Sequence, residues 1–191
     1  MTTVSIIGNG NMGTAIGGIV AEGGNAVEFI GRDADAAITG DIVVLAVGYP
    51  AVADVLAQHG EKLAGKVVVD ITNPLNFETF DSLVVPADSS AAAEIAAQLP
   101  ESRVLKAFNT NFAATLSSKT VGGAAPTTVH IAGDDSEAKA LLGSVLQAGG
   151  VDSIDAGTLA RARELEAIGF LQLTLAVQEK AGWASGYALI K

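Results

Sequence analysis

Six residues near the start of the chain have the types and spacing of a phosphate-binding turn. The segment 8–13 reads Gly-Asn-Gly-Asn-Met-Gly and lies between two short apolar stretches. In a strand-turn-helix unit, this G-x-G-x-x-G pattern holds the pyrophosphate of a dinucleotide at the positive end of the helix. We expect Gly8 to permit the tight turn, Gly10 to let backbone N–H groups approach the phosphates, and Gly13 to let the helix pack closely on its strand.

The residues after the second predicted strand, 26–30, indicate which dinucleotide fits. An NAD site has an Asp or Glu there for the ribose diol, whereas an NADP site has a small residue and an Arg for the 2′-phosphate. Gly31 and Arg32 fit the NADP pattern, because a guanidinium binds phosphate with two hydrogen bonds and glycine leaves room for it. Asp33 follows at once, so NAD stays an alternative, and Arg32 could instead pair with Asp33 or Asp35 in solvent.

Two loops that follow apolar runs carry further candidates. The first contains Val47, Gly48 and Tyr49, and the second contains Asn73 and Pro74. Ligands of parallel sheets bind outside the carboxyl ends of the strands, so both loops should border the nicotinamide half of the cofactor. Pro74 holds Asn73 in an extended conformation, which could aim its amide at the carboxamide or the ribose. The alternative is that these segments only end strands and begin turns.

Short apolar runs alternate with helical stretches along the chain, which is typical of a parallel sheet covered on both faces. We therefore predict an α/β fold, a Rossmann-like doubly wound and mostly parallel sheet with a long C-terminal helix, as a single domain spanning 1–191. The predicted strands are 3–7, 26–30, 42–47, 66–71, 103–108, 127–132 and 151–155, and the predicted helices are 11–22, 50–63, 90–98, 135–148 and 159–181.

The second crossover is unusually short. Only residues 31–40 separate the second predicted strand from the third. A complete nucleotide-binding half has a helix, a further strand and another crossing in this place, and one crossover alone takes at least ~10–12 residues. We expect a short helix there at most, and no additional strand.

The composition excludes several classes of function. The net charge is −10, and clustered Lys or Arg residues that would bind nucleic-acid phosphates are absent from the sequence. Zero cysteines exclude disulfides, thiolate zinc sites and cysteine nucleophiles, and we expect no metal site. No stretch approaches the ~20 apolar residues that span a bilayer, and no leader pattern is seen, so we expect a cytoplasmic protein without a membrane partner.

Other polar residues have ordinary interpretations. His59 lies in a polar stretch and is expected to be solvated, whereas His130 lies between apolar residues of a predicted strand and is expected to be structural. Ser89 and Ser90 should cap the helix that follows, although either could reach a substrate. Lys106 lies in an apolar strand, so it either faces a cleft or extends its ammonium group toward water.

Together, five segments resemble the coenzyme F-420 (F420)-dependent NADP oxidoreductase family. They are the glycine turn 8–13, Asp-Ile-Thr-Asn-Pro at 70–74, Lys-Ala-Phe-Asn-Thr at 106–110, Asp-Ala-Gly at 155–157 and Ala-Arg-Glu-Leu-Glu at 162–166. The resemblance spans nearly the whole chain. It implies a Rossmann domain that carries NADP, with direct hydride exchange between the nicotinamide and a deazaflavin ring stacked on it.

The resemblance also implies roles for individual residues. The glycine turn would hold the pyrophosphate, Arg32 the 2′-phosphate, and Asn73 with Pro74 would flank the nicotinamide. The expected cofactor-binding set is Gly8, Asn9, Gly10, Asn11, Met12, Gly13, Gly31, Arg32, Val47, Gly48, Tyr49, Asn73 and Pro74.

Three functions are consistent with the sequence. We expect an NADP-dependent oxidoreductase that exchanges hydride with coenzyme F420 or a flavin-like acceptor, a reaction that requires no catalytic side chain because the cofactor carries the chemistry. An imine or carbonyl reductase would need a proton donor near the nicotinamide, for which Tyr49, Lys106 and Ser90 are the candidates. The third hypothesis is a dinucleotide-responsive binding protein without turnover.

The final predicted helix also indicates an assembly. Apolar residues cover most of its circumference over residues 165–177, and such a helix has to be buried on more than one side. The same helix of a second subunit would cover the remaining side, so we expect a homodimer with Phe170 or Leu171 near its axis. The alternative is that residues 182–190 fold back over that side.

The assignment of Arg32 predicts a cofactor preference. Removing a charge-assisted bidentate contact should cost about 1.5–3 kcal/mol, so Arg32→Ala should bind NADP roughly tenfold to a hundredfold more weakly and NAD about as well as before. Titration of both proteins with both dinucleotides tests this. Equal NADP affinity in the two proteins would refute the role of Arg32.

Overall fold

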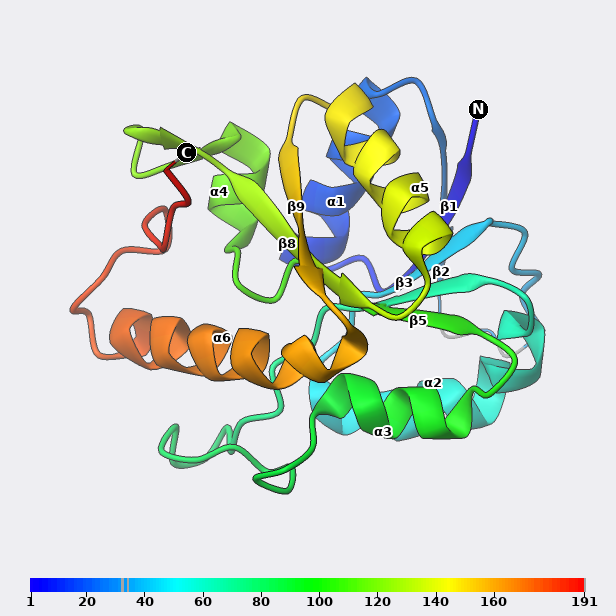
Figure 1. Ribbon diagram of the computed structural model, residues 1–191, viewed down its shortest axis with the longest axis horizontal. Helices are drawn as coiled ribbons and strands as arrows, with labels where there is room; N and C mark the ends of the chain where they lie inside the picture. The colour runs from blue at the N-terminus through cyan, green and yellow to red at the C-terminus, as the bar shows by residue number, and fades with distance from the viewer. Residues whose placement is uncertain (32, 34, 191) are drawn as a thin grey trace.

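The computed structural model describes residues 1–31, 33 and 35–190, so Arg32 lies outside the described residues. Its centre is a seven-stranded sheet of order β2-β1-β3-β4-β5-β8-β9 (Figure 1). The neighbouring strands pair in parallel except β5 and β8, which confirms the predicted α/β fold. The strands are β1 (Thr3–Ile7), β2 (Ala26–Ile30), β3 (Ile42–Leu45), β4 (Val67–Asp70), β5 (Arg103–Lys106), β8 (Thr128–Gly133) and β9 (Asp152–Gly157), with a separate hairpin of β6 (Thr120–Val121) and β7 (Ala125–Pro126).

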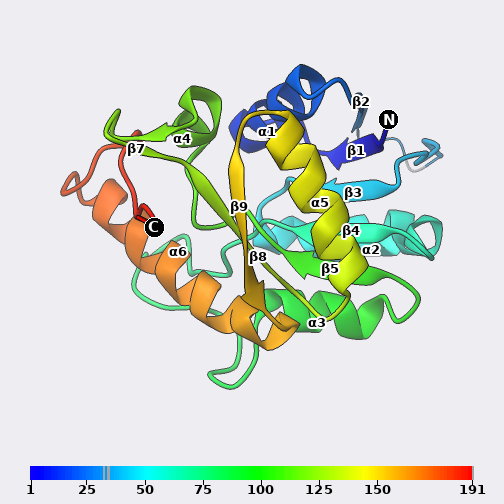
Figure 2. The same cartoon turned by 45° about the horizontal axis from the view of Figure 1, so that its top comes forward.

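Helices cover both faces of the sheet (Figures 1 and 2). One face is covered by α1 and α5, with α4 packed on α1, and the other face is covered by α2 and α3. The last helix, α6, packs against α3 and β8. The helices are α1 (Asn11–Glu22), α2 (Val52–His59), α3 (Ala91–Gln98), α4 (Ala113–Ser118), α5 (Ser136–Ala148) and α6 (Ala162–Val177), with 3-10 turns at Tyr49–Ala51, Gly60–Leu63 and Leu159–Arg161.

The central strands are apolar on both sides because both sides are covered. In β3 every residue is buried. Ile42 and Val44 point into the core beneath α1 and α5, whereas Val43 and Leu45 point into the core above α2 and α3. One strand of alternating side chains therefore contributes to two cores, and its carboxyl end is fixed from both faces.

The segment between β5 and β8 contains elements that the sequence pattern does not predict. They are α4 and the hairpin of β6 and β7. Each is shorter than the stretch over which hydrophobic periodicity becomes recognisable. This excursion brings the chain back so that β8 runs antiparallel to β5.

The shortened crossover leaves β2 at the edge of the sheet, and no further strand lies beyond β2 in the part of the chain that the structure describes. Residues 31, 33 and 35–41 contain no helix, which is consistent with the expectation of a short helix at most. Polar contacts hold the segment instead. Ser5 Oγ donates to Glu28 Oε2 at 2.5 Å and accepts from Gly40 N at 2.9 Å, and Thr39 N donates to Glu28 Oε2 at 3.1 Å.

Two predictions need correction. The helix expected over 159–181 is a 3-10 turn followed by α6, and it ends at Val177, just before Glu179 adopts a left-handed φ of 58°. His59, expected to be solvated, is only 2% exposed. Burial, with the charge of Lys62, lowers the pKa of His59, against the opposing effect of Asp33. As for membranes, the helices of the described residues are all too short or too polar to cross one.

The Ser5 contacts predict a measurable contribution to stability. Ser5→Ala leaves the N–H of Gly40 without its acceptor and removes one of the donors to Glu28, so the free energy of unfolding at pH 7 should fall by about 1–3 kcal/mol. Urea unfolding measures this, and Ser144→Ala, at an exposed position of α5, is the control. No difference between the two variants would contradict the prediction.

The same variant should show a pH dependence of known sign. Burial alone would raise the pKa of Glu28, but hydrogen bonds from Ser5 and Thr39 and the charge of Lys66 hold it below its ordinary value of 4.5. A carboxyl group with a lowered pKa stabilises the fold above its unfolded pKa, and this contribution is lost as the pH falls through the folded pKa. The effect of Ser5→Ala should therefore be smaller in acid than at pH 7.

Candidate functional site

The glycine turn packs so tightly against the end of β3 that two of its positions exclude side chains. Gly8 has a left-handed φ of 108°, and a Cβ atom there would overlap the carbonyl oxygen of Ala46. A Cβ atom on Gly13 would overlap the carbonyl oxygen of Gly8. These two glycines fix the place where α1 begins relative to the sheet.

Gly10 has the opposite surroundings. Its φ and ψ are −71° and −170°, which suit any residue, and a Cβ atom there would meet nothing within 4 Å. Gly10 is the N-cap of α1, and its carbonyl oxygen accepts from Thr14 N at 2.9 Å. The first N–H groups of a helix have no acceptor within the helix. The space next to Gly10 is therefore open beside the backbone N–H groups at the start of α1, where the helix dipole is positive. A pyrophosphate group would fit such a place.

A cavity of about 310 Å³, the smaller cavity, lies where the turn meets the ends of β3 and β4. Most of the residues predicted to lie at this edge line it. Phe77 and Leu173 also line it, and no local pattern had singled them out. The lining residues are Gly10, Asn11, Met12, Ala46, Val47, Gly48, Tyr49, Ile71, Thr72, Asn73, Phe77 and Leu173.

A second cavity of about 760 Å³, the larger cavity, adjoins the smaller one and runs between α1 and α4. The two share the lining residues Asn11, Met12, Ile71, Asn73 and Leu173. Away from this shared wall, the larger cavity is lined by Phe112 and Trp183, whose ring centroids are 5.0 Å apart, and by the ion pair of Lys119 and Glu22. Two compartments therefore meet at one wall.

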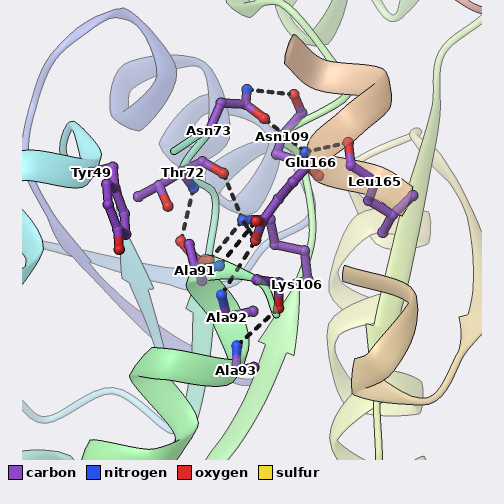
Figure 3. Close-up of polar contacts among 12 residues, drawn as sticks. Tyr49, Thr72, Asn73, Ala91, Ala92, Ala93, Lys106, Asn109, Leu165 and Glu166 are labelled. Atoms are coloured by element: carbon purple, nitrogen blue, oxygen red, sulfur yellow. Dashed lines mark hydrogen bonds and ion pairs between the residues drawn. The ribbon is translucent and has the colours of Figure 1, made fainter. Parts of the chain in front are cut away.

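Asn73 is held in place by a pair of amides. Its Nδ2 donates to the carbonyl oxygen of Asn109 at 2.9 Å, and Asn109 Nδ2 donates to Asn73 Oδ1 at 2.9 Å and to the carbonyl oxygen of Leu165 at 2.8 Å (Figure 3). A Cβ atom on Gly169 would overlap Asn73 Oδ1. The glycine thus lets α6 approach the amide pair directly.

Behind this edge lies a buried cluster of three charges. Lys106 Nζ donates to Asp70 Oδ2 at 2.7 Å, to the carbonyl oxygen of Thr72 at 2.6 Å and to Glu166 Oε1 at 2.8 Å (Figure 3). The three charged side chains are at most 1% exposed. The sequence left two alternatives for Lys106, a side chain that faces a cleft or one that extends toward water, and the structure shows neither. An ammonium with three oxygen partners can remain in the interior.

Glu166 also joins α6 to the start of α3. Its Oε2 accepts from Ala91 N at 2.9 Å, and next to it Ser90 Oγ accepts from Ala93 N at 3.1 Å. Burial raises the pKa of Glu166, although the charge and hydrogen bonds of Lys106 and Ala91 act in the other direction. Ser90 is thus the buried N-cap of α3, as expected for a capping serine.

Tyr49 lines the smaller cavity, but its hydroxyl group donates to Glu94 Oε2 of α3 at 2.6 Å. Burial, with the hydrogen bond to Glu94 and its charge, raises the pKa of Tyr49. Tyr49 therefore donates away from the cavity to Glu94, and the other two candidate proton donors, Lys106 and Ser90, are buried and line neither cavity.

In and after β2, the described carboxylates of Glu28 and Asp33 accept local hydrogen bonds. Asp33 Oδ1 accepts from Asp35 N at 2.9 Å, and Glu28 accepts from Ser5 and Thr39. Gly31 is exposed at the end of β2. Pro74 begins a loop and accepts at its carbonyl oxygen from Val84 N at 2.7 Å.

Known proteins are similar to this chain in sequence. A profile of the family described as "NADP oxidoreductase coenzyme F420-dependent" matches residues 26–74. An F420-dependent NADP reductase from Methanocaldococcus jannaschii is 33% identical over 168 residues, which span 85% of this chain and 74% of that protein.

Two crystal structures are similar over most of their length. A candidate F420-dependent NADP-reductase from Arthrobacter sp. FB24 matches with a TM-score of 0.86 and 25% identity over 100% of both chains. A hypothetical protein from Sinorhizobium meliloti matches with a TM-score of 0.72 and 26% identity, over 84% of this chain and 87% of that one.

The two alanine substitutions Gly13→Ala and Gly10→Ala in the glycine turn should differ in their effect on the free energy of unfolding. Gly13→Ala places a methyl group on backbone atoms that cannot yield without moving the turn, so the free energy of unfolding should fall by about 1–3 kcal/mol. Gly10→Ala meets open space in an allowed conformation, and the smaller entropy of its unfolded chain is offset by a weaker N-cap, so the free energy of unfolding should change by less than about 1 kcal/mol. Urea unfolding of the two variants checks this, and equal destabilisation would contradict it.

Proposed function

The chain belongs to the coenzyme F420-dependent NADP oxidoreductase family, and on this premise we propose that it transfers hydride between NADP and a deazaflavin or flavin-like acceptor. The relative from Methanocaldococcus jannaschii, which covers most of both chains, establishes the family. The single observation that supports this function most is the wall shared by the two cavities. A hydride donor on one side of such a wall and an acceptor on the other would meet directly.

The residues of the smaller cavity fit the nicotinamide half of NADP. The free N–H groups of α1 would bind the pyrophosphate in the space in front of Gly10. Asn73, fixed by Asn109, would orient the carboxamide or the ribose. The side chains of Met12 and Leu173 would exclude water from the meeting point with the larger cavity. When bound, the cofactor itself supplies the hydride chemistry.

NADP is proposed in preference to NAD. Glu28 Oε2 already accepts from Ser5 and Thr39, and Asp33 Oδ1 accepts from Asp35 N, which leaves fewer acceptor sites on these two carboxylates for a ribose diol. Gly31 followed by Arg32 fits a 2′-phosphate.

An acceptor that needs no acid from the protein agrees with the cavity walls. Tyr49 and Lys106 are engaged elsewhere, and the charged residues that line the larger cavity, Glu22 and Lys119, pair with each other. A conjugated ring such as a deazaflavin can spread the charge that arrives with a hydride, whereas an imine reductase depends more on a positioned proton donor. These observations support the deazaflavin or flavin-like acceptor over an imine.

The test measures NADPH oxidation with coenzyme F420, free flavins and a cyclic imine as acceptors. We expect turnover with F420 or a flavin, and a preference for NADPH over NADH. Turnover with the imine alone would favour an imine reductase. NADPH binding without turnover on the full panel would favour a binding protein.

Two glycine variants separate the cavities in this assay. Gly10→Val places its side chain where the pyrophosphate would lie, so it should fold normally and lose NADPH binding. Gly18→Leu places its side chain in the larger cavity, with nothing within 4 Å of its Cβ, so it should keep NADPH binding and raise the KM for the acceptor. Normal NADPH affinity in folded Gly10→Val would contradict the proposed cofactor site.

We also propose that residues 1–191 form a single domain that assembles as a homodimer through α6. On its outer face Ile168 and Leu171 are 40% and 51% exposed, an arrangement that a second copy would cover. The C-terminal segment covers a different part of the helix, where Tyr187 N donates to Gln172 Oε1 at 3.3 Å. Phe170 is half-buried within the subunit, whereas Leu171 is exposed, so Leu171 is the better candidate for the dimer axis.

The dimer has a direct test. Light scattering at micromolar concentration should give a dimer for the wild type and for Val84→Glu, whose exposed position lies in the loop before α3. Leu171→Glu should give a monomer, because charges placed on an isologous contact meet each other. A monomeric wild type would refute the dimer, and a dimeric Leu171→Glu would move the interface elsewhere.

A further inference from the structure

The buried cluster around Lys106 has no part in the proposed hydride transfer, yet it joins the elements that form the smaller cavity. The ammonium contacts Asp70 at the end of β4, the carbonyl oxygen of Thr72 just beyond it, and Glu166 on α6. An ammonium has three protons, and these three oxygens account for all of them. The ammonium group therefore has no proton left to donate to a ligand, and its role is to hold these three elements together.

The cluster fixes both peptide groups of Thr72. The N–H of Thr72 donates to Asp70 Oδ1 at 2.8 Å, and its carbonyl oxygen accepts from Lys106 Nζ at 2.6 Å. With both ends held, the chain cannot turn either peptide plane without breaking a buried, charge-assisted hydrogen bond. The next residue is Asn73, and both Thr72 and Asn73 line the smaller cavity.

The same cluster sets the position of α6. Glu166 holds the first half of the helix to Lys106 and to the start of α3. Farther along, Gly169 lies directly against Asn73, and Leu173 lines both cavities. A shift of α6 would therefore move one wall of the cofactor pocket and press on the amide pair.

From these contacts we infer that Lys106 is a positioning residue for the nicotinamide half of the cofactor. It acts through the carbonyl group of Thr72 and, by way of Glu166, through α6. The inference rests on the proposed NADP site. Stability alone does not account for the cluster, since buried ion pairs replaced by well-packed apolar residues often cost a protein nothing.

The test removes the ammonium group while keeping an acceptor for the N–H of Thr72 and one for the N–H of Ala91. The triple variant Asp70→Asn, Lys106→Met, Glu166→Gln leaves an oxygen for the N–H of Thr72 and one for the start of α3, and it leaves no unpaired charge in the interior. Two ligands are titrated: NADP, and adenosine 2′,5′-bisphosphate, which lacks the nicotinamide. The expected result is NADP binding weakened about tenfold, with binding of the bisphosphate changed less than about twofold.

Lys66→Met is the matched control. Lys66 Nζ donates to the carbonyl oxygen of Gly40 at 2.8 Å just before the other end of β4, so this variant loses a lysine–carbonyl hydrogen bond away from the cavities. It should leave the ratio of the two affinities unchanged. A merely structural role for Lys106 would likewise leave that ratio unchanged, or weaken both ligands equally.

The outcomes distinguish this inference from the proposed function. If the wild type does not bind NADP, the proposed function fails. If the wild type binds NADP and the folded triple variant keeps the wild-type ratio, only the inference is overturned. Should the triple variant not fold, the comparison is made on Asp70→Asn, Lys106→Gln, Glu166→Gln, where an amide with two N–H donors replaces an ammonium with three and no buried charge is left unpaired. A selective loss of NADP affinity supports the inference, and an unchanged ratio overturns it.

Discussion

A positive charge that is removed from water has to be surrounded by oxygen atoms, and this constraint organises the edge of the sheet where the cavities lie. Lys106 is fully buried, so the chain has to bring Asp70, Thr72 and Glu166 to one point. These partners come from the end of β4, the loop beyond it and α6. Through Glu166 the start of α3 joins the same network. One ammonium group thus ties together the loop after β4 and α6, which both contribute to the wall of the smaller cavity.

The glycine turn meets a complementary constraint, because it has to keep space free. Gly8 and Gly13 lie where any side chain would strike backbone atoms, so they bring α1 close to the end of β3. Gly10 lies where a side chain would fit, and its absence leaves room in front of the helix N-terminus. Three glycines of one motif therefore serve two purposes, close packing and access for a phosphate.

The chemistry proposed for this protein follows from what the cavity walls contain. The shared wall is built of apolar side chains and amides, whereas the charged groups nearby are paired or buried. Such a wall can position two flat rings and exclude water, but it offers no group to transfer a proton. In the proposed reaction the bound cofactor itself would supply the hydride chemistry.

The sequence by itself determined the features that depend on short-range pattern. The G-x-G-x-x-G turn, the apolar strands and the loops at Val47 and Asn73 were all recognisable, because strand and turn preferences are local and parallel strands end at a common edge. Only the tertiary structure decided which distant groups meet. Lys106 and His59 are buried, and Leu173 lines the cavities. The partner of Lys106 on α6 is 60 residues away in the sequence. No local pattern encodes contacts between elements that are so far apart in the chain.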